Sequence, residues 1–473
     1  MKKFFSRIYF FVMVFVAIGS GILISHVVLA GGSFVKIEFS KIVDETENLI
    51  GRKNKAEVIE AVAYTPPEDK TAGVYLGNIT DEDFIPPEEG KIIRINLETM
   101  KLFAYEDGEV VKEIEVLRKG KPGSYWETPG GEFSIKTKEE NHLSSVGRAW
   151  MPYSMQFFGN FFIHGWPSYE NGIPYPKTSQ YSGGCIRLST EDAKDLYEWS
   201  DIGTKVSIYS ESEIGKIAQG ESYFLLDKNK KPNIDSESYI VGDLESGEIL
   251  LAKNMLEVRP IASVTKLMTA LTELEVVSQR RDVTITKDML SAEGQNGGFS
   301  VGEKIPTSDL IYPLLLVSSN DAAEILARFV GRNHFIEQMN KKAQSIGLEY
   351  TTFYDPSGLS EFNTSTAYDL LKLARYIYFY KPYVLETTVE KDYETENHYW
   401  KNTSQFLGQE GYMGGKRGYT SLAKETNLGI FEINVNEFTK RPIGIIVLGS
   451  NDRKEDTLDL IKYIEENIYL GLE

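Results

Sequence analysis

The stretch Arg259-Pro-Ile-Ala-Ser-Val-Thr-Lys-Leu-Met-Thr-Ala270 decides how the second half of this chain is interpreted. Leucines recur at helical spacing after Ser263, which predicts a helix that begins near this serine and buries one face. The three-residue spacing places the Ser263 hydroxyl and the Lys266 amine on one side of that helix. A helix N-terminus offers N–H groups to a developing anion, and a desolvated lysine can act as a base. The stretch therefore predicts a serine nucleophile.

This tetrad is weak evidence when it stands alone. Ser33-x-x-Lys36 and Ser421-x-x-Lys424 match it in the same chain. The order of the motifs that follow is more specific: Ser318-Ser-Asn320, Asp355-Pro-Ser-Gly-Leu359, Ser365-Thr-Ala-Tyr-Asp369 and Lys416-Arg-Gly-Tyr-Thr420. Over residues 236–470, this set resembles the D-alanyl-D-alanine carboxypeptidase family of low-molecular-weight penicillin-binding proteins.

The resemblance implies a role for each residue of these motifs. Ser263 is expected to be the nucleophile and Lys266 its base, while Ser318 relays protons. Asn320 is expected to hold the substrate backbone, Lys416 to set the field around the substrate carboxylate, and the N–H groups of Ser263 and Tyr419 to bind the oxyanion. Arg417 and Gly418, which follow Lys416, are also expected to line the substrate site.

Arg417 departs from the family pattern, in which Thr or Ser follows the lysine. An arginine there can replace the hydroxyl with a charge-assisted contact to the substrate carboxylate. Its bulk can instead close the cleft. The second alternative predicts an inactive domain that only recognises stem peptides.

The single cysteine, Cys185, lies in Ser182-Gly-Gly-Cys-Ile-Arg-Leu188. Glycines before a cysteine allow backbone N–H groups to converge on the atom that the sulfur attacks. A thiol also needs a base, and His164 is the natural candidate because it ends the apolar run that begins at Asn160. Taken separately, a lone histidine and a lone cysteine are more often structural than catalytic.

Together with Met151-Pro-Tyr-Ser-Met155 and Glu127-Thr-Pro-Gly-Gly131, these residues resemble the L,D-transpeptidase catalytic domain over residues 89–210. The resemblance implies that Cys185 attacks a tetrapeptide stem and releases D-alanine, that His164 moves the proton, and that an amine on a neighbouring stem takes the acyl group. Gly184 and Cys185 are then expected to supply oxyanion N–H groups, and Arg187 to position the loop or the substrate. Gly183 stands where many members carry a second histidine.

The chain is long enough for several domains. We expect a signal peptide or transmembrane anchor (1–30), a polar stalk (31–88), a mostly-β L,D-transpeptidase-like domain (89–210), a linker (211–235) and an α+β serine β-lactamase/penicillin-binding-like domain (236–473). In the first domain, strands are predicted at 91–97, 101–105, 110–117, 132–136, 160–164 and 205–209, with a turn at 106–109 and a helix at 190–199. In the second, strands are predicted at 239–243, 248–252, 428–434 and 443–448, and helices from 263 and at 308–317, 321–331, 333–346, 367–380 and 454–468.

The N-terminal thirty residues predict export. Lys2, Lys3 and Arg7 precede an apolar run from Ile8 to Ala30, close to the roughly 20 residues that cross a bilayer. Its length favours an uncleaved anchor, whereas Val28-Leu-Ala30 fits a signal-peptide cleavage site. The net charge of −18 argues against nucleic acid as a partner. The five scattered histidines predict no metal site, and no cofactor is expected.

These expectations combine into an envelope enzyme that acts on peptidoglycan stem peptides and that β-lactams should inhibit covalently. A carboxypeptidase trims pentapeptide stems to tetrapeptides, and tetrapeptides are the acyl donors of L,D-transpeptidases. One chain with both activities makes its own donor at a high local concentration. Two alternatives stay open for the second domain, a D,D-endopeptidase and a non-catalytic binding module.

Overall fold

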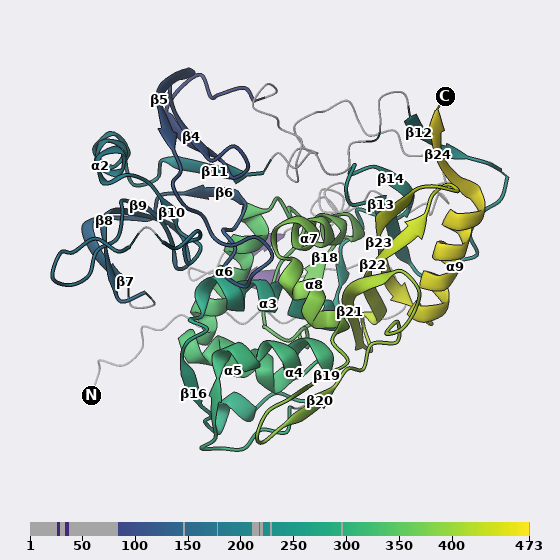
Figure 1. Cartoon of the computed structure of the whole chain (residues 1–473). Helices are drawn as coiled ribbons and strands as arrows, with labels where there is room; N and C mark the ends of the chain where they lie inside the picture. Colours follow the sequence, from purple (N-terminus) through teal and green to yellow (C-terminus); the bar gives the residue numbers. More distant parts are fainter. Residues whose placement is uncertain are drawn as a thin grey trace. The chain divides into compact units, whose positions relative to one another are not determined.

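The structure is a computed structural model that describes residues 84–472, except 145–146, 177, 211–216, 218–220, 228 and 295–296, and two short N-terminal strands. These strands, β1 (His26–Val28) and β2 (Phe34–Lys36), pair antiparallel. Residues 61–473 form one compact unit, separate from residues 1–60. Figure 1 traces the elements along the chain.

The predicted N-terminal helix lies outside the described residues, apart from His26–Val28. These three residues form a strand instead of continuing a helix, and Val27 and Val28 are β-branched residues that favour strands. Of the predicted stalk, only β2 and residues 84–88 are described. Within the described part of the chain, no helix has the length and apolar character needed to span a membrane.

Described residues 84–210, which we call the cysteine lobe, contain two sheets and one helix. The first sheet has the order β5-β4-β3-β11-β6 and the second the order β10-β9-β8-β7. Their strands are β3 (Lys91–Asn96), β4 (Lys101–Glu106), β5 (Glu109–Glu115), β6 (Gly131–Ser134), β7 (Thr137–Ser144), β8 (Ala149–Phe158), β9 (Phe161–His164), β10 (Ile186–Arg187) and β11 (Lys205–Tyr209). Helix α2 (Thr190–Trp199) begins at Ser189, whose side chain accepts a hydrogen bond from the Asp192 N–H. The inward residues of both sheets form one apolar core.

Most elements of this lobe lie where the sequence predicts them. The tight turn at Asp107 and Gly108 has φ values of 50° and 86°, as a hairpin with two left-handed residues requires. No strand is predicted from the sequence where β7 and β8 lie. β7 is a polar edge strand, and β8 contains Pro152, a residue that argues against a strand when it is judged locally.

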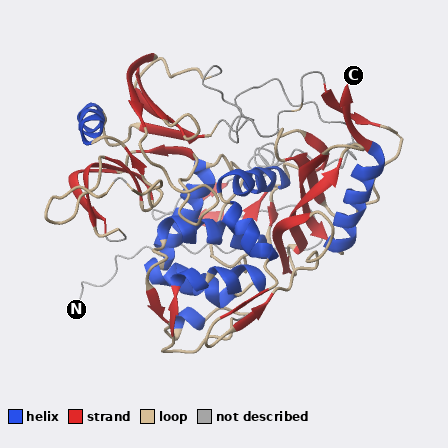
Figure 2. Cartoon of the chain, in the orientation of Figure 1, coloured by secondary structure: helices blue, strands red, loops and turns tan. Residues whose placement is uncertain are grey.

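Described residues 221–472, which we call the serine lobe, are built on an antiparallel sheet of order β14-β13-β23-β22-β21. Its strands are β13 (Ser238–Asp243), β14 (Ile249–Lys253), β21 (Tyr412–Thr420), β22 (Lys424–Asn434) and β23 (Lys440–Ser450). Helix α9 (Arg453–Asn467) packs with one apolar cluster against the sheet, and a larger apolar cluster joins the sheet to the remaining helices. Figure 2 shows these helices in blue and the sheet in red.

The remaining helices are η1 (Ala262–Val264), α3 (Thr265–Val276), η2 (Asp288–Leu290), η3 (Thr307–Asp309), α4 (Ile311–Leu316), α5 (Asn320–Val330), α6 (Arg332–Ser345), α7 (Ala367–Tyr380) and α8 (Pro382–Val389). Short strand pairs complete the lobe: β15 (Arg259–Pro260) with β18 (Thr364–Ser365), β16 (Asp282–Thr284) with β17 (Lys304–Pro306), and β19 (Asp392–Glu394) with β20 (Tyr399–Lys401). The helices and strands predicted for 236–473 are present, most with bounds shifted by a few residues. In the described part of the predicted linker, Glu221–Leu225 form β12, which pairs with the C-terminal strand β24 (Ile468–Leu472).

Candidate active sites

Ser263 lies in η1, the short helix that runs directly into α3. The preceding residue, Ala262, has a φ of 48°, a left-handed conformation that is costly for a residue with a side chain. Gly358 lies against this turn, and a Cβ on Gly358 would come within 2.0 Å of the Ala262 carbonyl oxygen. Close packing of the chain therefore holds Ser263 at the start of the helix.

Lys266 is fully buried one helical turn after Ser263. Its Nζ donates to Ser263 Oγ at 2.9 Å, to Asn320 Oδ1 at 2.7 Å and to the Ser357 carbonyl at 2.5 Å. Burial lowers the pKa of Lys266 to about 7, although the negative charge of Asp355 opposes the shift. Near neutral pH, a large fraction of this amine is therefore unprotonated and able to accept the Ser263 proton.

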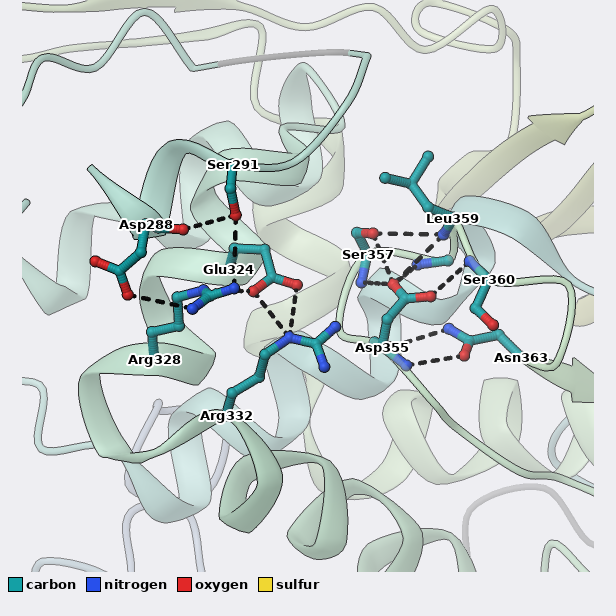
Figure 3. A network of polar contacts seen from close by, with 11 residues as sticks. Asp288, Ser291, Glu324, Arg328, Arg332, Asp355, Ser357, Leu359, Ser360 and Asn363 are labelled. Atoms are coloured by element: carbon teal, nitrogen blue, oxygen red, sulfur yellow. Dashed lines mark hydrogen bonds and ion pairs between the residues drawn. The ribbon is translucent and has the colours of Figure 1, made fainter. Parts of the chain in front are cut away.

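Asp355 orders the loop that supplies the Ser357 carbonyl (Figure 3). Its carboxylate accepts hydrogen bonds from the N–H groups of Ser357, Gly358 and Ser360 at 2.6–2.8 Å. Burial by itself would raise the pKa of Asp355, but these hydrogen bonds hold it below its ordinary value. No role for Asp355 is predicted from the sequence, although an acidic residue directly before Pro-Ser-Gly is a signal for one.

Asn320 is the first residue of α5, and Ser319 caps this helix by accepting the Ala322 N–H at 3.1 Å. While Asn320 Oδ1 accepts from Lys266, its Nδ2 donates to the Glu293 carbonyl at 2.7 Å. Further along the helix, the Glu324 carboxylate binds Arg328 and Arg332 (Figure 3). The amide of Asn320 is thus held by partners on both of its polar atoms.

Ser318 and Lys416 meet although 98 residues separate them, with Lys416 Nζ donating to Ser318 Oγ at 2.8 Å. Ser318 has a φ of 59°. Burial lowers the pKa of Lys416 well below its ordinary value, and the nearby charges of Lys266, Arg417 and Arg453 lower it further. The motifs that contain Ser263, Ser318 and Lys416 are therefore brought together in one place.

The residues after Lys416 lie on the edge strand β21. A Cβ on Gly418 would come within 2.7 Å of the Ser263 nitrogen, so this strand passes directly beside the nucleophile and only glycine fits. The Gly418 carbonyl accepts from Arg453 Nη1 at 3.1 Å. Tyr419 is 66% exposed, and Arg417 adds to the positive charge around Lys416 and Arg453.

Cys185 immediately precedes β10, which pairs in parallel with β9. In this register Arg187 lies opposite His164 and Ile186 opposite Ile163, so the pairing brings the cysteine and the histidine to neighbouring strands. Burial raises the pKa of the Cys185 thiol. Its Sγ–H points to the Asn160 carbonyl at 3.8 Å.

His164 is buried, and its Nδ1 lies 2.6 Å from the Gly165 carbonyl. A carbonyl only accepts, so Nδ1 carries the proton and Nε2 of the neutral ring is left as the acceptor. Burial lowers the pKa of His164 to about 3, although the hydrogen bond to Gly165 opposes the shift. The Gly165 carbonyl thus orients the predicted base, a role that the sequence analysis missed because every residue carries such a carbonyl.

The loop before Cys185 is fixed by internal hydrogen bonds. Ser182 Oγ donates to the Cys185 carbonyl at 2.6 Å and accepts the Gly184 N–H at 3.0 Å. Thr128 Oγ1 donates to the Gly184 carbonyl at 2.8 Å. The Gly184 N–H, expected to bind an oxyanion, instead donates to Ser182 because the turn brings that hydroxyl to it; the oxyanion role of the Cys185 N–H stays a prediction.

Arg187 lies beside the cysteine site with its guanidinium carbon 5.9 Å from the centre of the Trp166 ring. Arg118 approaches the same ring at 5.7 Å, and the main chains of the two arginines are hydrogen-bonded. Burial lowers the pKa of Arg187 from its ordinary value. The position fits both roles expected for Arg187, because its backbone braces the loop and its charge can attract a carboxylate.

Two family models match the chain, one over each of the two sites. The model described as D-alanyl-D-alanine carboxypeptidase matches residues 226–436, and the model described as L,D-transpeptidase catalytic domain matches residues 90–208. The first range contains Ser263 and Lys266, and the second contains His164 and Cys185.

Individual relatives and solved structures match about half of the chain. A D-alanyl-D-alanine endopeptidase of Haemophilus influenzae is 32% identical over 225 residues, which are 46% of this chain and 76% of that protein. The D-alanyl-D-alanine carboxypeptidase DacF of Bacillus subtilis is 28% identical over 244 residues, 49% of this chain and 61% of that protein. The structure of penicillin-binding protein D2 from Listeria monocytogenes in its ampicillin-bound form is 29% identical, with a TM-score of 0.44, covering 50% of this chain and 98% of that one.

Proposed function

This chain belongs to the D-alanyl-D-alanine carboxypeptidase family and also matches the L,D-transpeptidase catalytic domain, and we propose that it carries both activities. In this proposal, it is a peptidoglycan enzyme that trims stem peptides at Ser263 and cross-links them at Cys185. The proposed activity at Ser263 rests on the 2.9 Å hydrogen bond between Ser263 Oγ and the buried amine of Lys266.

In the serine reaction, neutral Lys266 takes the Ser263 proton while Oγ attacks the carbonyl between the two terminal D-alanines. The Ser263 and Tyr419 N–H groups stabilise the oxyanion. The proton that Lys266 took is relayed by Ser318, which is bonded to Lys416, to the leaving amine; D-alanine departs, an acyl-enzyme forms and Lys266 is neutral again. Water then releases the tetrapeptide stem.

The choice between carboxypeptidase and endopeptidase rests on the charge beside the nucleophile. Lys416 and Arg417 on β21 and Arg453 beside it place basic side chains next to Ser263, and the last of them also pairs with Glu425. A free terminal carboxylate is the part of a pentapeptide stem that such a cluster attracts, and a cross-linked stem can lack it at that position. We therefore favour carboxypeptidase action, with endopeptidase action, the activity named for the Haemophilus relative, as the alternative.

In the cysteine reaction, His164 Nε2 takes the proton of Cys185 and the thiolate attacks the L,D bond of a tetrapeptide stem. The terminal D-alanine leaves with a proton, and the acyl group stays on sulfur as a thioester. An amine of a neighbouring stem then attacks this thioester, His164 accepts the amine proton, and the cross-link is released. The first site produces the donor that the second site uses.

A defined pentapeptide stem and mass spectrometry of the products test the two activities in one experiment. Wild-type protein should release one D-alanine, then a second with formation of an L,D cross-link. Ser263→Ala should abolish the first release but still cross-link added tetrapeptide. Cys185→Ala should stop at the tetrapeptide, and a Cys185→Ala protein that still cross-links would exclude this nucleophile.

The site of action follows from the substrate. Peptidoglycan stems lie outside the cytoplasm, so we propose an extracytoplasmic enzyme held to the membrane by its N-terminal segment. β-Lactams mimic the D-alanyl-D-alanine end and should acylate Ser263. Labelling of the chain by a fluorescent penicillin, and its loss in Ser263→Ala, tests this part.

A further inference from the structure

Asn160, in the turn between β8 and β9, binds the end of helix α3. Its N–H donates to the Glu275 carbonyl at 3.2 Å, and its side-chain Nδ2 donates to the Val276 carbonyl at 2.9 Å. The last carbonyls of a helix have no partner within the helix. Asn160 of the cysteine lobe therefore caps the helix that carries Lys266 at its other end.

Lys381, between α7 and α8, makes a second contact between the two lobes. Its fully buried Nζ donates to the Glu127 carbonyl at 2.6 Å and lies 3.6 Å from the Glu275 carboxylate. The same carboxylate pairs with Lys342 at 3.0 Å. A buried ammonium group needs such partners, and one of them is the main chain of the cysteine lobe.

Three glycines of the cysteine lobe leave room for this contact. A Cβ on Gly130 would lie 2.5 Å from the Tyr380 ring, one on Gly131 would lie 2.7 Å from the Ser345 carbonyl, and one on Gly159 would lie 2.3 Å from the Glu275 carbonyl. Real Cβ atoms do not approach other atoms so closely. The surface is therefore shaped for this contact by the sequence of both lobes.

Both contacted segments border Cys185. The Asn160 carbonyl accepts the thiol hydrogen. The segment after Glu127 continues to Thr128, whose hydroxyl holds the Gly184 carbonyl. The hydrogen bond that Asn160 donates to Val276 and the one that Glu127 accepts from Lys381 thus hold two segments that contact Cys185 and the loop before it.

We propose that Asn160 and Lys381 are positioning residues for the Cys185 site, and that the serine lobe, through the end of α3, holds the cysteine loop in its reactive geometry. A twelve-residue helix such as α3 is about 18 Å long and stiff. It therefore holds the carbonyls that bind Asn160 at a constant distance from Ser263. Misplacing reacting groups by about 1 Å can cost on the order of 100-fold in rate. The catalytic consequence rests on the function proposed above, but the support of the thiol does not.

The full-length chain offers a direct probe, because Cys185 is its only cysteine and iodoacetamide therefore reports on it alone. Lys381→Met removes the donor to Glu127. The thiol is already partly exposed; with its loop loosened, more water should reach it, lower its pKa and speed alkylation at fixed pH by about tenfold for each unit of that fall. Cross-linking should slow by roughly 10–100-fold. Lys381→Gln, which keeps an N–H donor, should recover part of both effects.

Lys372→Met is the matched control, because Lys372 Nζ also donates to a main-chain carbonyl, that of Gly347, but within the serine lobe. It should alkylate at the wild-type rate. Penicillin acylation of Ser263 shows that each variant is folded.

Asn160→Ala keeps the test open if Lys381→Met fails to fold, because the Asn160 side chain is exposed and its loss removes only the bond to Val276. It should also speed alkylation. Alkylation that stays at the wild-type rate or slows in the folded variants would overturn the proposal. A wild-type chain that forms no cross-links would refute the proposed activity and leave the alkylation result intact.

Discussion

At the scale of single residues, the proposed serine reaction depends on the pKa of Lys266. Burial brings it to about 7, and only the neutral amine can accept the Ser263 proton. Penicillin acylation should therefore fall about tenfold per pH unit below 7 and level off above it. Rates measured on both sides of pH 7 check this, and a profile without a step near 7 contradicts the assignment of the base. Lys266→Met should lose roughly 10²–10⁴-fold in rate at every pH.

The proposed role of Arg417 is to bind the free carboxylate of the substrate at the serine site. If its guanidinium binds that carboxylate, Arg417→Ala should lose about 1.5–3 kcal/mol of binding, which slows D-alanine release by roughly 10–150-fold. Arg417→Thr should recover part of the activity, because a hydroxyl can bond the same group. Each variant is assayed with Cys185→Ala, which silences the other site. A gain of activity in both variants would show that the side chain blocks the cleft.

At the scale of elements, the conformation of the loop before β10 requires a glycine at position 184 but not at position 183. Gly184 has a φ of 103°, and a Cβ there would lie 2.2 Å from the Phe161 ring. Gly184→Ala should therefore cost about 2–5 kcal/mol from overpacking and backbone strain and should abolish cross-linking. Thermal unfolding and the cross-linking assay check both outcomes.

The neighbouring glycine supplies the control for this prediction. A Cβ on Gly183 would meet no atom within 4 Å, and its φ lies outside the left-handed region. Gly183→Ala should leave the unfolding temperature unchanged. If both variants lowered the unfolding temperature equally, the loss would come from the backbone entropy of any glycine, and not from the conformation and packing of Gly184.

At the scale of the whole molecule, Glu275 holds two buried lysines near the contact between the lobes. Glu275→Gln removes the charge that both Lys342 and Lys381 face. Breaking a buried ion pair from one side costs about 3–5 kcal/mol, so the urea midpoint should fall markedly. Glu337→Gln is the control, because Glu337 pairs with Lys341 at 2.6 Å on the surface and should leave the midpoint unchanged. Equal midpoints for both variants would contradict the structural role of Glu275.

Local sequence determined the parts of this protein that depend on short spacings. The helix at Ser263, the hairpin at Asp107 and Gly108 and most strands around them follow from periodicity and turn chemistry, which act over a few residues. The two proposed nucleophiles, with Lys266 and His164 as their proposed bases, also follow from motifs, because a helical turn or a strand end fixes the neighbours of each residue. The order of the motifs along the chain carried the resemblance to both families.

Only the tertiary structure decided which distant groups meet. Lys416 reaches Ser318 across 98 residues, and Lys266 finds Asn320 and the Ser357 carbonyl in two other segments. The Gly165 carbonyl accepts a hydrogen bond from His164 and so orients its ring. In the same way, β12 pairs with β24 and Asn160 caps α3. None of these partners has a local signature, because main-chain carbonyls are present at every residue and long-range contacts form only when the whole core packs.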